Sequence, residues 1–185
     1  MKNYNPLNFW KLMLTKIPQK QFSLFRLKTT ISRKKTLSRV VVAGIPLCLE
    51  KGWKDKGGGG GEKVERGKVL ISPGDQHMML KLDGNGYSVT MNKGELVNRH
   101  RPSVDVLFRS VANLAGSNSI GVILTGMGDD GAKGMFEMHK AGSYNLAQDE
   151  ESCVVYGMPR KAVENGAVDE VLNLEGIFKR LIELS

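Results

Sequence analysis

The chain has 185 residues, of which 41% are hydrophobic and 25% charged, a composition typical of a globular protein with a buried core. It contains no run of about 18 apolar residues, which excludes a transmembrane helix. The net charge of +8 suggests nucleic-acid binding, but residues 1–49 hold ten Lys or Arg and no acidic residue. The remainder is therefore slightly acidic, and overall basicity is no argument for a DNA-binding fold.

Two isolated cysteines, Cys48 and Cys153, lie in no paired motif. We therefore expect neither a disulfide framework nor a zinc site. We expect reduced thiols in a cytoplasmic protein, and neither a cofactor nor a metal.

Composition divides the chain into three zones. Residues 1–39 form a basic N-terminal arm, which we expect to be poorly ordered, although a basic, acid-free start is also typical of a transit peptide. Residues 40–61 are a divergent segment, in which Val40–Val42 predicts a short strand. The five-glycine run Gly57–Gly61 then indicates a flexible linker, because phosphate-binding loops need glycines at set spacing. Residues 62–185 are expected to form the compact domain.

The first half of the compact domain predicts a strand, a hairpin and a helix. Turn residues Asp83–Gly86 separate two apolar stretches and indicate a β-hairpin. Apolar residues at helical spacing follow Pro102 and end at Gly116. The predicted elements are a strand at Val69–Ile71, hairpin strands at Met79–Leu82 and Tyr87–Met91, and a helix between Pro102 and Gly116.

The second half alternates strands and helices. Its predicted elements are an apolar strand at Ile120–Leu124, a helix at Asp130–Ala141, a strand at Tyr144–Ala147, a helix from Pro159 to Gly166, an extended piece at Val168–Leu172 and a helix at Leu174–Leu184. This alternation is typical of an α/β fold, a doubly wound and mainly parallel sheet with helices on both faces. The predicted fold also contains the β-hairpin, in addition to this sheet.

Candidate chemistry concentrates in the loop Gly126–Gly131. Ligands of open parallel sheets bind at the carboxyl ends of strands, and this loop follows the apolar strand directly. Asp129 and Asp130 stand there before a helix, where a carboxylate is a helix cap, a catalytic group or a cation ligand. His77 and His100 are predicted on loops, and His139 on a helix surface.

Several segments together resemble the catalytic domain of bacterial chemotaxis protein-glutamate methylesterases. The segment Gly121–Gly131, reading GVILTGMGDDG, resembles the signature strand and loop of that family. The resemblance covers about residues 62–185. Its other segments are Gly67–His77, His100–Phe108, Ala147–Pro159 and Asn165–Val171.

The resemblance implies a doubly wound α/β hydrolase that demethylates, and also deamidates, glutamyl side chains of chemotaxis receptors. Family members use a serine, a histidine and an aspartate, and the aspartate maps to Asp130, with Asp129 at a variable position. Met127, Gly126, Gly128 and His100 map to the neighbourhood of the active site. The implied partners are methyl-accepting receptors, with no nucleic acid and no membrane insertion.

The front of the chain departs from the family pattern. Residues 1–61 contain no Gly-x-Ser-x-Gly-Gly-like turn for the family serine, and alignment of Val40–Pro46 places Gly44 at the histidine position. The family's receiver domain is not recognisable either, so the front looks truncated or rearranged. We therefore expect a damaged catalytic set, unless His77 or His100 takes the vacant position and recruits Ser72 or Ser103. The alternative is an inactive remnant or a receptor-binding module.

Overall fold

A computed structural model describes residues 26–27, 40–44, 60–64 and 70–184 of the chain. Its main sheet has five strands in the order β1-β2-β5-β6-β7. The four strands β2, β5, β6 and β7 run parallel, and β1 is antiparallel to β2. Their bounds are Arg26–Leu27 (β1), Val40–Gly44 (β2), Ser119–Ile123 (β5), Tyr144–Gln148 (β6) and Glu170–Leu172 (β7).

Strand β5 is central, as its apolar sequence predicts. It lies between β2 and β6, and each of its five residues is buried. Ile123 packs into the core on one face, whereas Ile120 and Val122 pack into the core on the other. A strand covered on both faces needs an unbroken apolar sequence, which explains why no polar alternation marks it.

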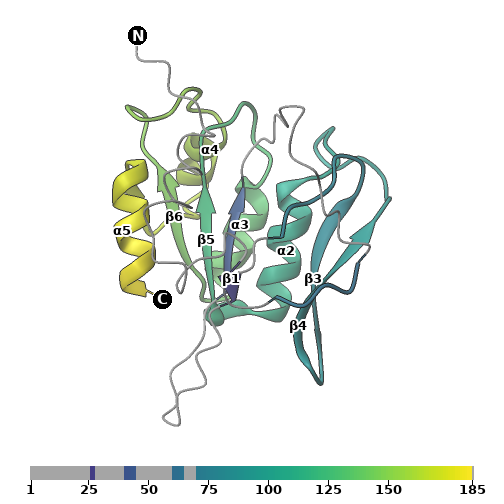
Figure 1. The fold of residues 1–185 in the computed structure, drawn as a ribbon. Helices are drawn as coiled ribbons and strands as arrows, with labels where there is room; N and C mark the ends of the chain where they lie inside the picture. The colour runs from purple at the N-terminus through teal and green to yellow at the C-terminus, as the bar shows by residue number, and fades with distance from the viewer. Residues whose placement is uncertain (1–25, 28–39, 45–59, 65–69, 185) are drawn as a thin grey trace.

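Helices cover both faces of the sheet (Figure 1). Residues of α2 (Val104–Leu114), α3 (Ala132–Lys140) and α4 (Met158–Glu164) share one core with Val40 and Val42. Helix α5 (Leu174–Leu184) covers the opposite face, where Ile177 and Leu181 are buried against Ile120 and Leu146. The predicted doubly wound α/β architecture is thus confirmed.

The predicted hairpin forms a separate two-stranded sheet beside α2 (Figure 1). Strand β3 (His77–Asp83) pairs with β4 (Gly86–Asn92), and the Asp83 carboxylate accepts the Asn85 N–H inside the turn. Ser110 on α2 accepts the Leu80 N–H at 2.8 Å, which ties the hairpin to the helix. Residues 60–64 run along the other edge of β4 through backbone hydrogen bonds.

The sequence predicted a strand at Val69–Ile71, and this prediction is wrong for Leu70 and Ile71, the two residues that the structure describes. Leu70 and Ile71 are not in a strand, and Val69 lies outside the described ranges. Pro73 opens a turn there that is closed by hydrogen bonds from Gln76 N–H to Pro73 O and from Ser72 Oγ to Gln76 O. Leu70 instead packs into the core that also contains Leu80 and Val89 of the hairpin.

The remaining predicted elements are confirmed, with shifted ends. Helix α2 begins after Ser103 rather than at Pro102, because Ser103 is extended, with φ −110° and ψ 136°. Helix α3 begins at Ala132, after Gly131 at φ 92°. Strand β2 extends the predicted Val40–Val42 to Gly44. No described helix has the length and apolarity that crossing a bilayer requires.

Candidate active site

The predicted site loop lies at the carboxyl end of β5. Thr125–Gly131 connects β5 to α3 and turns through two glycines at positive φ, Gly128 at 89° and Gly131 at 92°. Asp129 is exposed on this loop, whereas Asp130 points inward and is only 5% exposed. Two adjacent carboxylates therefore have different surroundings, and Asp130 is the one the fold encloses.

The Asp130 carboxylate accepts four hydrogen bonds. Its Oδ1 accepts Ser103 Oγ–H at 2.7 Å, Asn98 Nδ2–H at 3.0 Å and the Asp105 N–H at 3.3 Å. Its Oδ2 accepts the Val104 N–H at 2.7 Å. The two backbone donors belong to the first turn of α2, so Asp130 caps α2 and not the helix it precedes, whose N-cap is Gly131 without a side-chain cap.

Asn98 is a site residue that sequence reasoning missed. Val97 and His100 exchange backbone hydrogen bonds of 3.1 and 2.9 Å, and between them Asn98 and Arg99 have φ of 52° and 66°. Two successive positive φ values define a tight hairpin turn of the primed kind, in which Asn is favoured. The turn points the Asn98 amide at Asp130. In the sequence, the only signal for this turn is that Asn98 lies four residues before Pro102.

Residue His77 is buried, which makes its prediction on a loop wrong. It begins β3, is 3% exposed, and accepts the Ser103 N–H on Nδ1 at 3.1 Å. Its Nε2 lies 2.8 Å from Glu95 O, so the proton sits on Nε2 and is donated to that carbonyl. Both ring nitrogens are engaged by backbone groups, which leaves no nitrogen free for proton transfer.

The other two histidines make no hydrogen bond to the Asp130 carboxylate. His100 is exposed in the turn with Asn98, as predicted for a loop residue. His139 is exposed on α3, as predicted, with Nδ1 3.6 Å from Asp169 Oδ1. All three histidines of the chain lie within the described ranges, and none hydrogen-bonds Asp130.

Ser103 is brought close to both His77 and Asp130, but in the wrong order for nucleophilic catalysis. A working triad places the imidazole between hydroxyl and carboxylate. Here the Ser103 hydroxyl donates directly to Asp130, and only its backbone N–H meets His77. Ser103 is also only 2% exposed. Ser72 donates to Gln76 O instead and binds neither His77 nor Asp130.

Gly44 ends β2 beside this network. Its carbonyl accepts the Leu124 N–H at 3.1 Å, at the carboxyl edge of the sheet. A Cβ at Gly44 would lie 2.5 Å from Val104 Cγ1, and the Val104 N–H binds Asp130. A side chain at position 44 would thus start next to the residue that binds the Asp130 carboxylate.

A second loop, residues 149–157, is fixed against the site loop by Gln148 and Thr125. The Gln148 Oε1 accepts the Thr125 N–H at 2.8 Å, while its Nε2 donates to Ser152 O at 2.8 Å. Thr125 Oγ1 accepts the Val155 N–H at 2.9 Å, and Gly126 N–H donates to Val155 O at 3.0 Å. Between these attachments Met127 remains 81% exposed.

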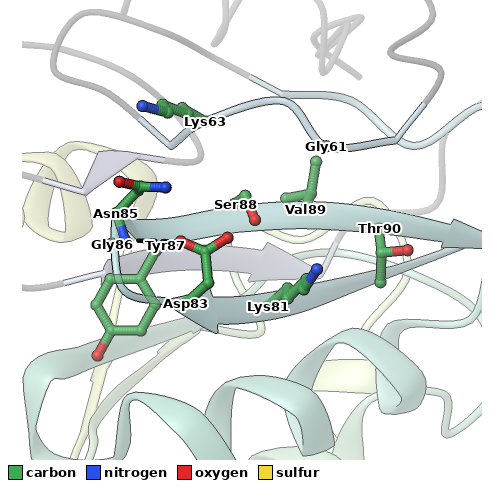
Figure 2. A pocket seen from close by; sticks show the side chains of 10 residues that line it. All are labelled: Gly61, Lys63, Lys81, Asp83, Asn85, Gly86, Tyr87, Ser88, Val89 and Thr90. Atoms are coloured by element: carbon green, nitrogen blue, oxygen red, sulfur yellow. Dashed lines mark hydrogen bonds between the residues drawn. The ribbon is translucent and has the colours of Figure 1, made fainter.

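A groove elsewhere on the domain contains none of the predicted site residues (Figure 2). It measures about 160 Å³ and lies between residues 60–64 and the hairpin, with Lys63, Lys81 and Asp83 among its lining side chains. Within the described ranges, no three His, Cys, Asp or Glu side chains gather as a metal site requires. The candidate chemistry thus stays at the carboxyl edge of the sheet.

Known proteins carry the same fold and the same sequence signature. The sequence profile described as CheB methylesterase matches residues 57–181. This chain belongs to the CheB methylesterase family. A solved relative is the methylesterase catalytic domain of Thermotoga maritima CheB, 42% identical with a TM-score of 0.65, the match covering 67% of this chain and 66% of that one.

The curated relatives of this CheB-family chain share one enzyme name among themselves. A protein-glutamate methylesterase/protein-glutamine glutaminase 2 of Rhizobium johnstonii is 58% identical over 122 residues, 66% of this chain and 33% of that protein. The corresponding enzyme of Nitrosomonas europaea is 55% identical over 123 residues, 66% of this chain and 34% of that protein. The chain therefore spans about a third of the length of these relatives.

Proposed function

We propose that this chain is a cytoplasmic protein with the protein-glutamate methylesterase fold. It binds chemotaxis receptors, but by itself it hydrolyses their glutamyl methyl esters very poorly. The family reaction converts a glutamyl methyl ester and water to a carboxylate, a proton and methanol, or a glutamine and water to a carboxylate and ammonium. Asp130 is the residue that we assign to the aspartate of the catalytic set, with Met127, Gly126, Gly128 and His100 around it.

The observation that carries this proposal is the hydrogen bonding of Asp130. Its carboxylate lies at the carboxyl end of the central strand, and its donors among the described residues are Asn98, Ser103 and the first turn of α2. An aspartate in such a set orients an imidazole and stabilises its charged form. No imidazole hydrogen-bonds Asp130, and His77, which accepts the Ser103 N–H, has both ring nitrogens bound to backbone groups.

Without a base, a serine hydroxyl is a weak nucleophile near neutral pH. Loss of triad members lowers turnover by about 10⁴- to 10⁶-fold in related triads. Gly44, which aligns with the family histidine, supports the same conclusion because it lies beside Val104 and offers no side chain. Recruitment of His77 would require breaking its bonds to Glu95 and Ser103 and leaving a buried position.

The test is release of methanol from methylated receptor by the purified chain and its Asp130→Asn variant, with the full-length Rhizobium johnstonii relative as the positive control. We expect no measurable turnover from either form of this chain. Family-like turnover that collapses in Asp130→Asn would show that a complete catalytic set exists. Equilibrium binding of the unmodified receptor to the chain separates a receptor-binding module from an inert remnant.

A further inference from the structure

The groove between residues 60–64 and the hairpin lies on the face of the hairpin opposite its packed core. Val89 of β4 packs into the core, so its neighbour Ser88 points to the other face of the strand. Ser88 lies opposite Lys81 of β3 on one side and opposite Lys63 on the other. Side chains directly opposite each other share a face. The two lysines and the serine therefore form one row across three adjacent strands, with Ser88 in the middle (Figure 2).

The two lysines of this row have no anionic partner among the described residues. Neither Lys63 nor Lys81 forms an ion pair there, whereas Lys93, at the end of the hairpin, binds Asp75 at 3.3 Å. Neighbouring strands are about 4.8 Å apart, so the Cα atoms of the two lysines are separated by about 10 Å. Both flexible side chains can thus reach one ion above Ser88.

The Ser88 hydroxyl is a second, independent sign of a ligand. Ser88 is only 7% exposed and lines the groove, yet its hydroxyl makes no hydrogen bond within the described part of the chain. A buried hydroxyl without a partner is unfavourable, and a ligand in the groove would supply that partner. Ammonium groups only donate hydrogen bonds, so the ligand that satisfies this row must offer acceptor oxygens.

The size and the charge of the groove restrict the ligand further. Its volume of about 160 Å³ is below the range of about 300–1,000 Å³ that is usual for drug-sized ligands. Its charged lining residues are Lys63, Lys81 and Asp83, which leaves a net positive charge. The Asp83 carboxylate accepts the Asn85 N–H at 2.8 Å, inside the turn at the end of the groove. A single small anion fits these limits.

We propose that the groove binds a small oxyanion with the chemistry of inorganic phosphate, held between Lys63 and Lys81 and hydrogen-bonded by the Ser88 hydroxyl. Thr90, which also lines the groove, places a second hydroxyl on the same face of β4. The site shares no residue with the hydrogen-bond network of Asp130. It is therefore independent of the proposed receptor binding and of any turnover.

The test is a titration of the isotope-labelled full chain with sodium phosphate, followed residue by residue through its amide NMR signals. Sodium chloride at matched ionic strength is the reference. We expect the amides of Gly61, Ser88 and Thr90 to shift together and to saturate at roughly millimolar phosphate. Acetate, with a single charge, should saturate them at higher concentration. Acetate binding as tight as phosphate would overturn the phosphate-like assignment.

Site-resolved signals are needed because residues 1–49 contain ten Lys or Arg, which attract phosphate without any defined site. Shifts confined to those residues, or identical shifts with chloride, would show an adventitious ion only and overturn the proposal.

Variants of the lining residues test the row directly. Lys63→Gln and Lys81→Gln should each weaken phosphate binding about fivefold, and Ser88→Ala should weaken it as well. Asp83→Asn, which removes the negative charge at the end of the groove, should tighten it. Lys133→Gln, at an exposed lysine of α3, is the matched control and should change nothing. A loss as large in Lys133→Gln as in Lys81→Gln would mean that only net charge matters, and the site would be refuted.

Discussion

Asp130 and Asp105 cap each other's helices. Asp130, which precedes α3, caps the N-terminus of α2, and Asp105, which lies in α2, caps the N-terminus of α3. Asp130, before α3, accepts the first N–H groups of α2, whereas Asp105, in the first turn of α2, accepts the Gly134 N–H of α3 at 2.7 Å. Asn98 Nδ2 donates to both carboxylates, at 2.6 Å to Asp105 and 3.0 Å to Asp130. The two buried charges are thus stabilised by helix N-termini and one amide.

Replacing Asp130 should therefore destabilise the fold, apart from any effect on catalysis. Asp130→Ala leaves Ser103 Oγ and two N–H groups of α2 without an acceptor, and we expect a loss of about 2–4 kcal/mol in the free energy of unfolding. Asp129→Ala, on the exposed neighbour, should change it by less than about 0.5 kcal/mol. Urea titration followed by circular dichroism measures both. Equal effects would contradict the burial difference between these neighbours.

His77 should behave as a structural histidine. His77→Phe keeps the ring volume but leaves the Glu95 carbonyl and the Ser103 N–H unpaired in the interior, which we expect to cost about 2–4 kcal/mol. His100→Gln, at an exposed turn position, should be nearly neutral. Thermal unfolding of the two variants provides the comparison, and a neutral His77→Phe would refute the two backbone bonds as a source of stability.

Gly134 allows close contact between α2 and α3. A Cβ at this position would lie 2.7 Å from Phe108 Cβ and 2.9 Å from Asp105 O. Although alanine favours helix by about 1 kcal/mol over glycine, we expect Gly134→Ala to destabilise by about 1–3 kcal/mol because the helices must move apart. Gly74→Ala, where nothing lies within 4 Å of the added Cβ, is the control. Chemical denaturation that ranks Gly134→Ala as stabilising would contradict this contact.

Glu170 should make part of the stability dependent on pH. Hydrogen bonds from Tyr144 and then Arg180 lower the pKa of the Glu170 carboxyl below its ordinary value of 4.5. A lowered pKa stabilises the fold above pH 4.5, and this contribution is lost as pH falls through the folded-state pKa. Glu170→Gln should thus cost up to about 1 kcal/mol at pH 7, because the pair is partly exposed.

Unfolding curves at several pH values test the Glu170 prediction. The gap between the unaltered chain and Glu170→Gln should close below pH 4.5. Glu175→Gln, in an exposed pair with Lys179, should show almost no gap at any pH. A gap for Glu170→Gln that widens in acid would reverse the assigned sign.

Local sequence predicted most of the elements, since apolar spacing marked β5, α2, α3 and α5 and turn residues marked the hairpin. The position of Asp130 at a strand end also followed from the sequence. The partners of Asp130 did not, because Asn98, Ser103 and the α2 N-terminus reach it across 25 to 32 residues. His77 was misplaced for the same reason, since its burial depends on Glu95 and Ser103 rather than on its neighbours.

The parallel register of β2 on β5 has a consequence for the order of folding. Val40 pairs with Ser119, and the hairpin and α2 lie between them along the chain. Closing so long a loop costs conformational entropy that the hairpin, with adjacent strands, does not incur. In pulse-labelling hydrogen exchange, amides of β3 and β4 should thus become protected first. Strand β2 should join last, and events that interrupt folding would leave the edge of β5 exposed.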